Sequence, residues 1–416
     1  MSLEVSKGWS RTTIAQVADI NIDNLSSNTS LDYQLNYIDV ATIVGPSIML
    51  EPHSVVFGEA PSRARRKVRS GDILVSTIRP YLRSFYKVMS KDPTLVASTA
   101  FAVVRPQPTV DGDFLYQHIL WCHFTEHLTL RMKGSNYPAV TATDVGEYSF
   151  LLPSLSEQRR IAEILSSVDD AIAATQAVIE QTKKVKQATL ERLLTKGIGH
   201  TRFKQTEVGD IPDSWDVATI ESYLARLIDY RGVPPPKAET GIPLITAKNV
   251  RMGYLNPEPR EYIREADFND WMRRGIPEAG DVLFTTEAPL GYVAQVPNYQ
   301  IALGQRTITL CPDRKRLNPS FLTWLLLSSA SQLRIMERAT GSTALGIKQA
   351  TFRKILFPFP PLDEQRKIAF YMDEIAKTEE LENRKLTGLI AIKSALMSDL
   401  LTGRKRVTDT LPLAAE

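Results

Sequence analysis

The sequence has little cysteine, no long apolar run and no large excess of charge of one sign. Its two cysteines, Cys122 and Cys311, are too few for a disulfide framework or a zinc cluster made of cysteines. No apolar stretch reaches the ~18 residues of a membrane span, and the opening segment MSLEVSKGWS lacks the apolar part of a secretory signal. We therefore expect a cytoplasmic protein without a membrane partner. The net charge of +3 is small, so a nucleic-acid interface requires local clusters of cations.

Signature motifs of three enzyme classes are also absent. An adenine methyltransferase needs an Asn/Asp-Pro-Pro-aromatic motif to hold the flipped base, and the sequence contains none. No glycine is followed by lysine, which excludes a Walker A phosphate loop. The Pro-Asp pairs at 212–213 and 312–313 lack a well-spaced acidic-x-Lys motif of a nuclease metal site. We expect that the chain by itself catalyses no reaction.

One candidate metal site lies in the stretch HILWCHFTEH. Its potential ligands are His118, Cys122, His123 and His127. The second half of the chain, which repeats the first, carries at these positions Leu325, Ser329, Ala330 and Arg334. Because the duplicated fold does not require the ligands, we interpret them as packing and surface side chains and expect no metal.

The chain consists of two copies of a unit of ~200 residues. This repeat length indicates a duplicated domain, because the repeats of solenoid proteins recur every 20–50 residues. PSLSEQRRIAEIL at 153–165 returns as PPLDEQRKIAFYM at 360–372, an offset of 207 residues (360 minus 153). The same offset aligns KGSNYPAV (133–140) with TGSTALGI (340–347). Trp9 and Trp215 stand near the start of each half.

Each unit is predicted to begin with a mixed α/β (α+β) domain and to end in one long helix. Short runs such as DILVST (72–77) and DVLFTT (281–286), bounded by Gly, Pro or Asp, indicate strands. The segments 113–132 and 320–338 indicate shorter helices. Residues 156–196 and 363–402 contain no proline, and Ser156 and Asp363 are suited to the N-cap positions.

Apolar residues recur at heptad-like spacing along both predicted long helices. They are Ile161, Leu165, Val168, Ile172, Ile179 and Leu193 in the first helix, and Ile368, Met372, Ile375, Leu386 and Leu400 in the second. Thr, Glu and Lys dilute the middle of each stripe. We therefore expect an antiparallel coiled coil with a partly polar seam and a pseudo-two-fold internal repeat. Forty helical residues span ~60 Å, so the pair would act as a spacer.

This organisation resembles the specificity (S) subunit of type I restriction-modification enzymes. The resemblance rests on the doubled order of globular domain and long helix, on the phrases LPSLSEQ (152–158) and FPPLDEQ (359–365), and on the endings LLTKG (193–197) and LLTG (400–403). It implies two target recognition domains, at 1–151 and 200–357, each reading one half of a bipartite DNA sequence. Conserved long helices at 152–199 and 358–404 would fix the distance between the halves, and 405–416 would form a disordered tail.

The resemblance also implies partners. These are double-stranded DNA, two adenine-methyltransferase (modification) subunits and, in the full complex, two restriction/translocase subunits. S-adenosylmethionine, ATP and Mg²⁺ would bind to those partners, so we expect no cofactor in this chain. The repeated phrase supplies the candidate partner interface, which comprises Glu157, Gln158, Arg159, Glu364, Gln365 and Arg366. A purely structural alternative is that Glu157 and Glu364 stabilise the helix N-termini.

Local clusters of cations support DNA contact. SRARRKVRS (62–70) has five cations in nine residues and is interpreted as a basic loop. Base reading requires Arg, Lys, Asn or Gln on loops, and TIRPYLR (77–83), KGSNY (133–137), TTEAPLG (285–291) and GQR (304–306) are plausible carriers. The predicted DNA-binding residues of the first unit are Arg63, Arg65, Arg66, Lys67, Arg69, Arg79, Arg83, Lys133, Asn136 and Tyr137. Those of the second unit are Arg231, Lys248, Asn249, Arg251, Arg273, Arg274, Thr286, Gln305, Arg306 and Lys348.

Two other functions stay open at this point. One is a recognition subunit of a related methylation or phage-defence system that lacks the nuclease. The other is a coiled-coil scaffold whose α/β domains bind proteins instead of DNA. The steepness with which DNA affinity falls with salt separates DNA binding from the scaffold function.

Overall fold

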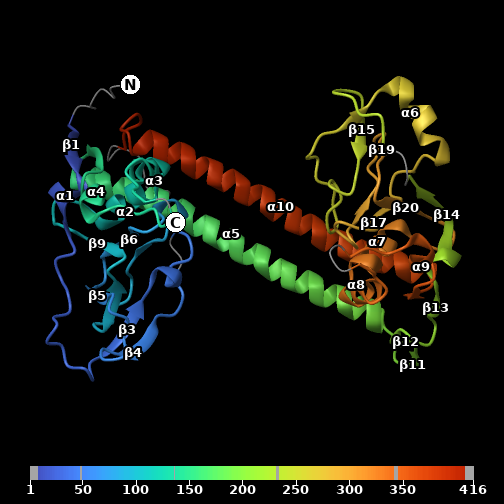
Figure 1. Ribbon diagram of the computed structural model, residues 1–416, viewed down its shortest axis with the longest axis horizontal. Coiled ribbons are helices and arrows are strands. Elements are labelled where there is room, and N and C mark those ends of the chain that lie inside the picture. The colour runs from blue at the N-terminus through green and yellow to red at the C-terminus, as the bar shows by residue number, and fades with distance from the viewer. Residues whose placement is uncertain (1–7, 47–48, 135, 231–233, 342–344, 408–416) are drawn as a thin grey trace, which may run out of the picture. The chain divides into compact units, whose positions relative to one another are not determined.

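The computed structural model describes residues 8–46, 49–134, 136–230, 234–341 and 345–407 (Figure 1). The chain forms two compact units: unit 1 is 1–176 with 385–416, and unit 2 is 177–384. Two long helices, α5 (Leu155–Lys196) and α10 (Leu362–Leu400), each belong to both units. Each unit therefore contains one end of each long helix, which confirms the prediction of two long helices after mixed α/β domains.

Unit 1 contains two four-stranded sheets and a two-stranded one. The first has the order β2 (Ala18–Ile20), β9 (Phe101–Pro106), β6 (Ile73–Ser76) and β7 (Phe85–Lys87). The second has the order β4 (His53–Val56), β3 (Gln34–Ile38), β8 (Leu95–Ser98) and β5 (Ala64–Lys67). The short sheet pairs β1 (Ser10–Thr13) with β10 (Ser149–Leu152). The helices are α1 (Ile14–Val17), α2 (Gly112–Leu120), α3 (Cys122–Thr129) and α4 (Ala142–Gly146).

Unit 2 repeats this topology with two differences, since its second sheet has three strands and it has a further two-stranded pair. Its four-stranded sheet has the order β14 (Leu224–Asp229), β20 (Thr307–Pro312), β17 (Val282–Thr285) and β18 (Val293–Gln295). The second sheet has the order β16 (Tyr262–Ile263), β15 (Ile242–Ile245) and β19 (Ala302–Leu303). Two further pairs are β13 (Asp216–Thr219) with β21 (Leu356–Phe359) and β11 (Phe203–Thr206) with β12 (Gly209–Pro212). The helices are α6 (Glu265–Trp271), α7 (Pro319–Leu327), α8 (Ser329–Met336) and α9 (Gln349–Phe352).

The equivalence of the two units extends to strand direction. β3 pairs with β8 in parallel, and β15 pairs with β19 in parallel, whereas the other sheet pairs are antiparallel. Most residues of the central strands β6 and β17 are apolar because these strands separate two cores. In β6, Ile73 and Val75 join one cluster and Leu74 joins another; in β17, Phe284 and Leu283 divide in the same way. Continuous apolar runs are expected of strands that are buried on both faces.

The long helices complete these cores. Ile161 and Leu165 of α5 pack in unit 1 with Leu400 of α10, and Ile368 and Met372 of α10 pack in unit 2 with other apolar side chains that include Leu190 of α5. Each helix is thus held by a core at both of its ends. Burial of such side chains contributes roughly 1.5–3 kcal/mol each.

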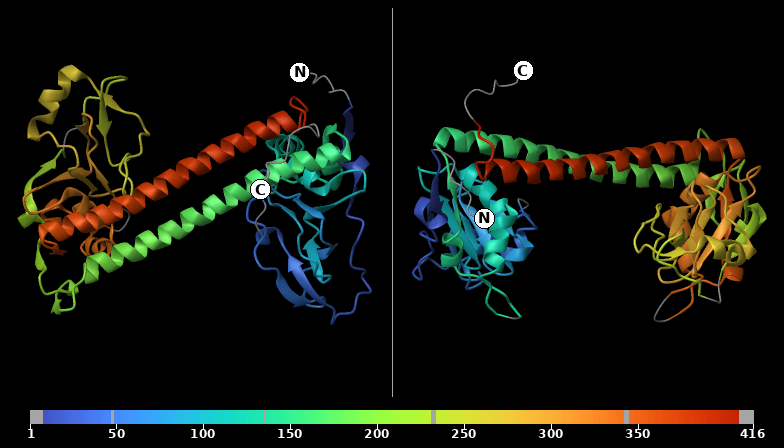
Figure 2. Two further views of the ribbon diagram at one scale, coloured as in Figure 1. Left: turned by 180° about the vertical axis from the view of Figure 1, so that it is seen from behind. Right: turned by 90° about the horizontal axis from the view of Figure 1, so that it is seen from above.

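Within each unit, the two long helices pair antiparallel and carry a polar seam (Figure 2). In unit 1, Lys393 of α10 forms an ion pair with Asp169 of α5. In unit 2, Lys186 of α5 forms an ion pair with Glu379 of α10. Residue numbers rise along one helix as they fall along the other, as the prediction of an antiparallel, partly polar coiled coil requires.

The predicted N-caps of the long helices are both wrong by two residues. α5 begins at Leu155, so the N-cap position is Ser154, whose Oγ accepts a hydrogen bond from the Glu157 N–H at 3.4 Å. α10 begins at Leu362, so Asp363 lies inside the first turn. There a carboxylate still interacts favourably with the helix dipole.

Candidate nucleic-acid interface

Two loops of unit 1 that lie far apart in the sequence are tied together by the backbone. The first, residues 77–83, follows β6, and the second, residues 133–139, follows α3; we call them the unit 1 loop pair. Ile78 bridges to Ala139, and the Arg79 N–H donates to the Pro138 carbonyl at 2.8 Å. Arg79 has φ 47°, a left-handed conformation that a non-glycine residue adopts only where its surroundings enforce it.

The side chains of the unit 1 loop pair form a polar and aromatic cluster. The Arg79 guanidinium lies 5.3 Å from the centroid of the Tyr137 ring, and the Tyr137 side chain is 73% exposed. Lys133 and Asn136 are exposed beside it in the second loop. The structure thus brings together four predicted DNA-binding residues from two separate stretches. Guanidinium, carboxamide and an exposed ring are the groups that contact base edges and stack on nucleotides.

Unit 2 has the equivalent loop pair, formed by residues 286–291 and, among the described residues, by 340–341 and 345–346. Here Glu287 bridges to Gly346, and the Ile347 N–H donates to the Thr286 carbonyl at 2.9 Å. The Thr286 N–H donates to the carbonyl of Arg306, which brings the predicted 304–306 segment to the same place. Arg306 is exposed, has φ 65° and pairs with the Glu287 carboxylate at 3.3 Å.

Several predicted DNA-binding side chains instead form hydrogen bonds within the chain. Thr286 is 3% exposed, and its hydroxyl donates to the Arg306 carbonyl. Asn249 is 2% exposed; its Oδ1 accepts from the Thr246 N–H and its Nδ2 donates to two backbone carbonyls. The predictions for these two buried residues are wrong, because their hydrogen-bonding groups are used within the chain. Arg83 is half-buried and donates to the Leu120 carbonyl.

The predicted basic loop at 62–70 is also wrong, because residues 64–67 form strand β5 at the edge of a sheet. Its cations have internal partners: Arg65 lies over the Phe57 ring at 4.7 Å, Arg66 donates to the Asn24 side chain at 2.8 Å, and Lys67 pairs with Asp23 at 3.8 Å. Burial lowers the pKa of Arg66 from its usual value. Arg63 and Arg69, at either side of the strand, are exposed.

The other candidates of unit 2 lie outside its loop pair. Lys248, Arg273, Arg274 and Lys348 are exposed, whereas Gln305 and Arg251 are half-buried. Arg251 donates to the backbone carbonyls of Lys248 and Val250, and Arg274 donates to that of Asp229. Arg231 lies outside the described residues.

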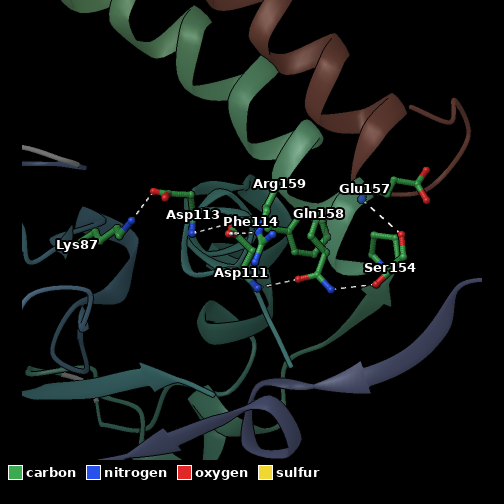
Figure 3. A network of polar contacts seen from close by, with 9 residues as sticks. Lys87, Asp111, Asp113, Phe114, Ser154, Glu157, Gln158 and Arg159 are labelled. Atoms are coloured by element: carbon green, nitrogen blue, oxygen red, sulfur yellow. Dashed lines mark hydrogen bonds and ion pairs between the residues drawn. The ribbon is translucent and has the colours of Figure 1, made fainter. Parts of the chain in front are cut away.

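The repeated phrase joins each long helix to its globular domain. Gln158 is 1% exposed; its Oε1 accepts from the Asp111 N–H at 2.7 Å and its Nε2 donates to the Pro153 carbonyl at 2.9 Å (Figure 3). Asp111 is the N-cap of α2, and its carboxylate accepts from two N–H groups of the first turn. Gln365 is fully buried and accepts from the N–H of Asn318, the N-cap of α7, at 2.9 Å.

The glutamates beside these glutamines each bind a tryptophan and a basic side chain. Glu157 accepts from Trp9 Nε1 at 3.1 Å and from Arg406, whose pKa is raised by these hydrogen bonds. Glu364 accepts from Trp215 Nε1 at 3.0 Å, and its Oε1 lies 2.9 Å from His200 Nε2. The residue that follows one long helix thus binds the carboxylate at the start of the other.

These contacts correct the predicted partner interface. Glu157, Gln158 and Gln365 are buried and Glu364 is half-buried, so all four serve internal contacts and are not available to another chain. The Arg159 and Arg366 side chains, 71% and 58% exposed, stay as candidates.

Sequence reasoning missed His200 and Arg406. Both stand three residues after a glycine that ends a long helix with positive φ, Gly197 (62°) and Gly403 (68°), and this shared spacing was the available signal. Arg406 and the buried Val407 also show that the predicted disordered tail begins too early, since both have fixed contacts.

The histidine-rich stretch does not assemble a metal site. His118 is buried among aromatic rings, His123 stacks on Trp121 at 4.0 Å, and His127 Nε2 lies 2.8 Å from the Asp144 carbonyl. Among the described residues, no three His, Cys, Asp or Glu side chains are grouped to hold a metal ion. In the same part of the chain, no helix combines the length and apolarity that a bilayer span requires.

Comparison with known proteins gives consistent matches. Residues 6–184 and 268–390 match the family described as type I restriction modification DNA specificity domain. The chain is 26% identical over 325 residues to the type I restriction enzyme MjaVIII specificity subunit of Methanocaldococcus jannaschii, covering 75% of each chain. Its fold is similar to that of the type I restriction-modification S subunit from M. genitalium, with a TM-score of 0.60 at 13% identity, covering 98% of this chain and 99% of that one. A chain from a study of complex assembly and conformational transition of the type I R-M system gives a TM-score of 0.59 at 23% identity, covering 97% and 100%.

Proposed function

Because the chain belongs to the type I restriction-modification DNA specificity family, we propose that it reads a bipartite DNA target, with one half-site for each unit. The observation that carries this proposal is the loop pair, which occurs once in each unit with the same backbone bridges and different side chains. A duplicated fold with different loops can read two different short sequences, because loop side chains can change without destabilising the core.

The two loop pairs offer different hydrogen-bonding groups. The unit 1 pair carries Arg79, Lys133 and Asn136, which suit guanine and adenine edges. The unit 2 pair carries Arg306 beside Glu287, a donor and an acceptor 3.3 Å apart. A carboxylate accepts from the cytosine amino group, so a G·C step suits this pair of side chains. The two half-sites therefore differ in sequence.

The complex would contain catalytic partners, and this chain contributes recognition and assembly. Two adenine-methyltransferase subunits bind along the long helices, and two restriction/translocase subunits join them in the cytoplasm. Support for a partner on α10 comes from its exposed apolar side chains: Phe370 is 61%, Tyr371 50%, Ile390 51% and Ile392 53% exposed. Methyl donor, ATP and Mg²⁺ belong to the partners.

The experiment is to map methylated adenines in a cell that expresses this chain with its methyltransferase partner. The expected result is a two-part motif for the wild-type chain. The double variant Arg79→Ala/Tyr137→Ala is expected to relax the sequence of one half-site by a factor of roughly 10–100, while the other half-site is unchanged. Lys91→Ala, which removes an exposed cation from a different loop of unit 1, is the matched control.

The outcomes separate the alternatives. If the target is methylated but the purified complex contains no restriction subunit, the result supports a defence or methylation system that lacks the nuclease. DNA affinity that is insensitive to salt, together with unaltered methylation in the absence of the chain, would instead support a scaffold that binds proteins. A single undivided motif would contradict the assignment of one half-site to each unit.

A further inference from the structure

Unit 1 contains a pocket of about 320 Å³, lined in part by the histidine-rich stretch, that neither the loop pair nor the hydrogen bonds of the repeated phrase use. It lies among β1, β10, α2, α3 and the end of α10. The side chains that define its chemistry are Arg11, His118, Trp121, His123, His127 and Tyr148. A volume of this size is at the lower end of the range for small-molecule sites.

His118 is the feature of this pocket that the fold leaves unexplained. Its side chain is 1% exposed, and neither ring nitrogen has a hydrogen-bond partner among the described residues. The ring packs against Phe150 at 4.6 Å and Phe114 at 4.8 Å. Burial lowers the pKa of His118 to about 3, so the imidazole is neutral and offers one N–H donor and one acceptor nitrogen. Buried polar groups normally have partners, so a missing one points to a ligand or a bound water.

The pocket also combines positive charge with flat rings. Arg11 is exposed on β1 and has no acidic partner among the described residues, whereas Arg131 is paired with Glu147 at 3.7 Å. His123 stacks on Trp121 with an interplanar angle of 26°, and Tyr148, which directly precedes β10, also lines the pocket. One unopposed guanidinium beside aromatic faces suits a flat molecule with a negative group.

The repeat shows that the fold does not need these residues. In unit 2, Leu325 replaces His118, and Ala330 replaces His123. Val217, which pairs with Pro358 as Arg11 pairs with Leu151, replaces Arg11. Leu325 is buried in the apolar core of unit 2. An apolar residue is therefore sufficient at the position of His118 if the side chain only has to pack in the core.

We propose that this pocket binds a small planar anion, an aromatic ring that carries a carboxylate or a phosphate. Arg11 would pair with the anionic group, His118 would hydrogen-bond to a polar atom of the ring, and Trp121 would contact the ring face. Leu401 and Thr402, at the end of α10, also line the pocket. The ligand would therefore contact both the globular domain and the long helix.

The test is calorimetric titration of the full chain with nicotinate and with adenosine monophosphate, which separate a carboxylate from a phosphate source. Nicotinamide, which has the ring without the charge, and cyclohexanecarboxylate, which has the charge without the flat ring, are the matched probes. We expect saturable binding of at least one of the two anions, and at least tenfold weaker binding of both controls. Arg11→Val and His118→Leu, the residues of unit 2, are each expected to weaken binding at least tenfold.

The folded state is checked in the same samples. His118→Leu should keep or raise the thermal midpoint, because it removes an unpartnered polar group from an apolar site. Lost binding with an intact midpoint thus supports the proposal. No saturable binding at millimolar concentrations would overturn it and leave a water as the partner of His118. Equal binding of nicotinamide, or undiminished binding by both variants, would also overturn it.

Discussion

At the scale of the residue, the buried glutamines explain why the chain contains the same phrase twice. Gln158 and Gln365 each accept a hydrogen bond from the N-cap residue of a shorter helix. Gln158 donates one hydrogen bond to the backbone before its long helix, whereas Gln365 donates two, to the carbonyls of Pro360 and Arg316. A carboxamide is required because the site needs an acceptor and a donor on one planar group. The phrase thus fixes the angle at which each long helix leaves its domain.

We expect Gln158→Ala to lower the free energy of unfolding of unit 1 by about 1–3 kcal/mol, because it leaves the Asp111 N–H without its acceptor. Gln365→Ala should do the same to unit 2. Calorimetric unfolding of the isolated chain measures both. Arg159→Ala, one residue away and exposed, is the control and should change stability little. Unfolding that is unaffected by both glutamine variants would return these residues to the partner interface.

His118 gives a pH dependence that can be isolated. Its folded pKa of about 3 lies below the ordinary value of 6.5, so the unfolded state binds the extra proton between these values. Stability is therefore fully present above pH ~6.5 and falls as the pH is lowered towards 3. We expect the wild type to lose about 2 kcal/mol more than His118→Leu between pH 7 and pH 5, as measured by denaturant unfolding. Parallel curves for the two proteins would contradict a buried neutral imidazole.

At the scale of the element, strand β5 and the loop pair should contribute to DNA binding in different ways. Replacement of Arg65, Arg66 and Lys67 by Ala should weaken binding to cognate and random duplexes alike, and lower the salt slope by up to ~0.9 for each lost phosphate contact. Tyr137→Ala should weaken cognate binding more than random binding. Because the three cations of β5 also have internal partners, the thermal midpoint of each variant is needed beside the titration. An unchanged salt slope would show that β5 faces away from the duplex.

At this scale, local sequence patterns predict the long helices, whereas features that depend on contacts between distant segments cannot be predicted. The long helices were predictable because their signal is local: apolar residues at heptad-like spacing, no proline and a first-turn glutamate. The burial of Gln158 was not predictable, because a polar residue in the first turn of a helix is usually exposed and its partner, Asp111, lies 47 residues away in the sequence. The three consecutive cations of β5 favour a loop in the sequence, whereas in the structure the strand pairs with β8 and its cations find partners in other segments. The loop pair likewise depends on bridges between distant segments, such as Ile78 with Ala139.

At the scale of the whole molecule, the length of the paired helices is expected to set the spacing between half-sites. Four helix-forming residues inserted in both helices, after Thr182 in α5 and after Glu382 in α10, add ~6 Å of rise, nearly two base-pair steps of 3.4 Å. Insertion in both is needed because ion pairs such as Lys186–Glu379 couple the two helices. Methylation mapping should then give the same two half-sites with a spacer one or two base pairs longer.

The control is an insertion of the same four residues after Ser90, in a loop of unit 1, which leaves both helices at their original length. It should keep the original spacer. DNA twist makes the distinction sharp, since each added base pair rotates the second half-site by ~34°. A spacer that does not change in the lengthened protein would limit the helices to a partner-binding surface.

The division of the chain between the two units has a consequence for its synthesis. Unit 2 is one continuous stretch, whereas unit 1 joins residues up to 176 with residues from 385 onwards. Its core includes Met397, Leu401 and Val407. On the ribosome, the part made first must therefore wait for 209 further residues (385 minus 176), roughly 10–40 s at 5–20 residues per second. The unit that is begun second is the first to be completed, and a nascent chain interrupted before residue 397 holds one finished unit and one that still exposes the surface its last helix would cover.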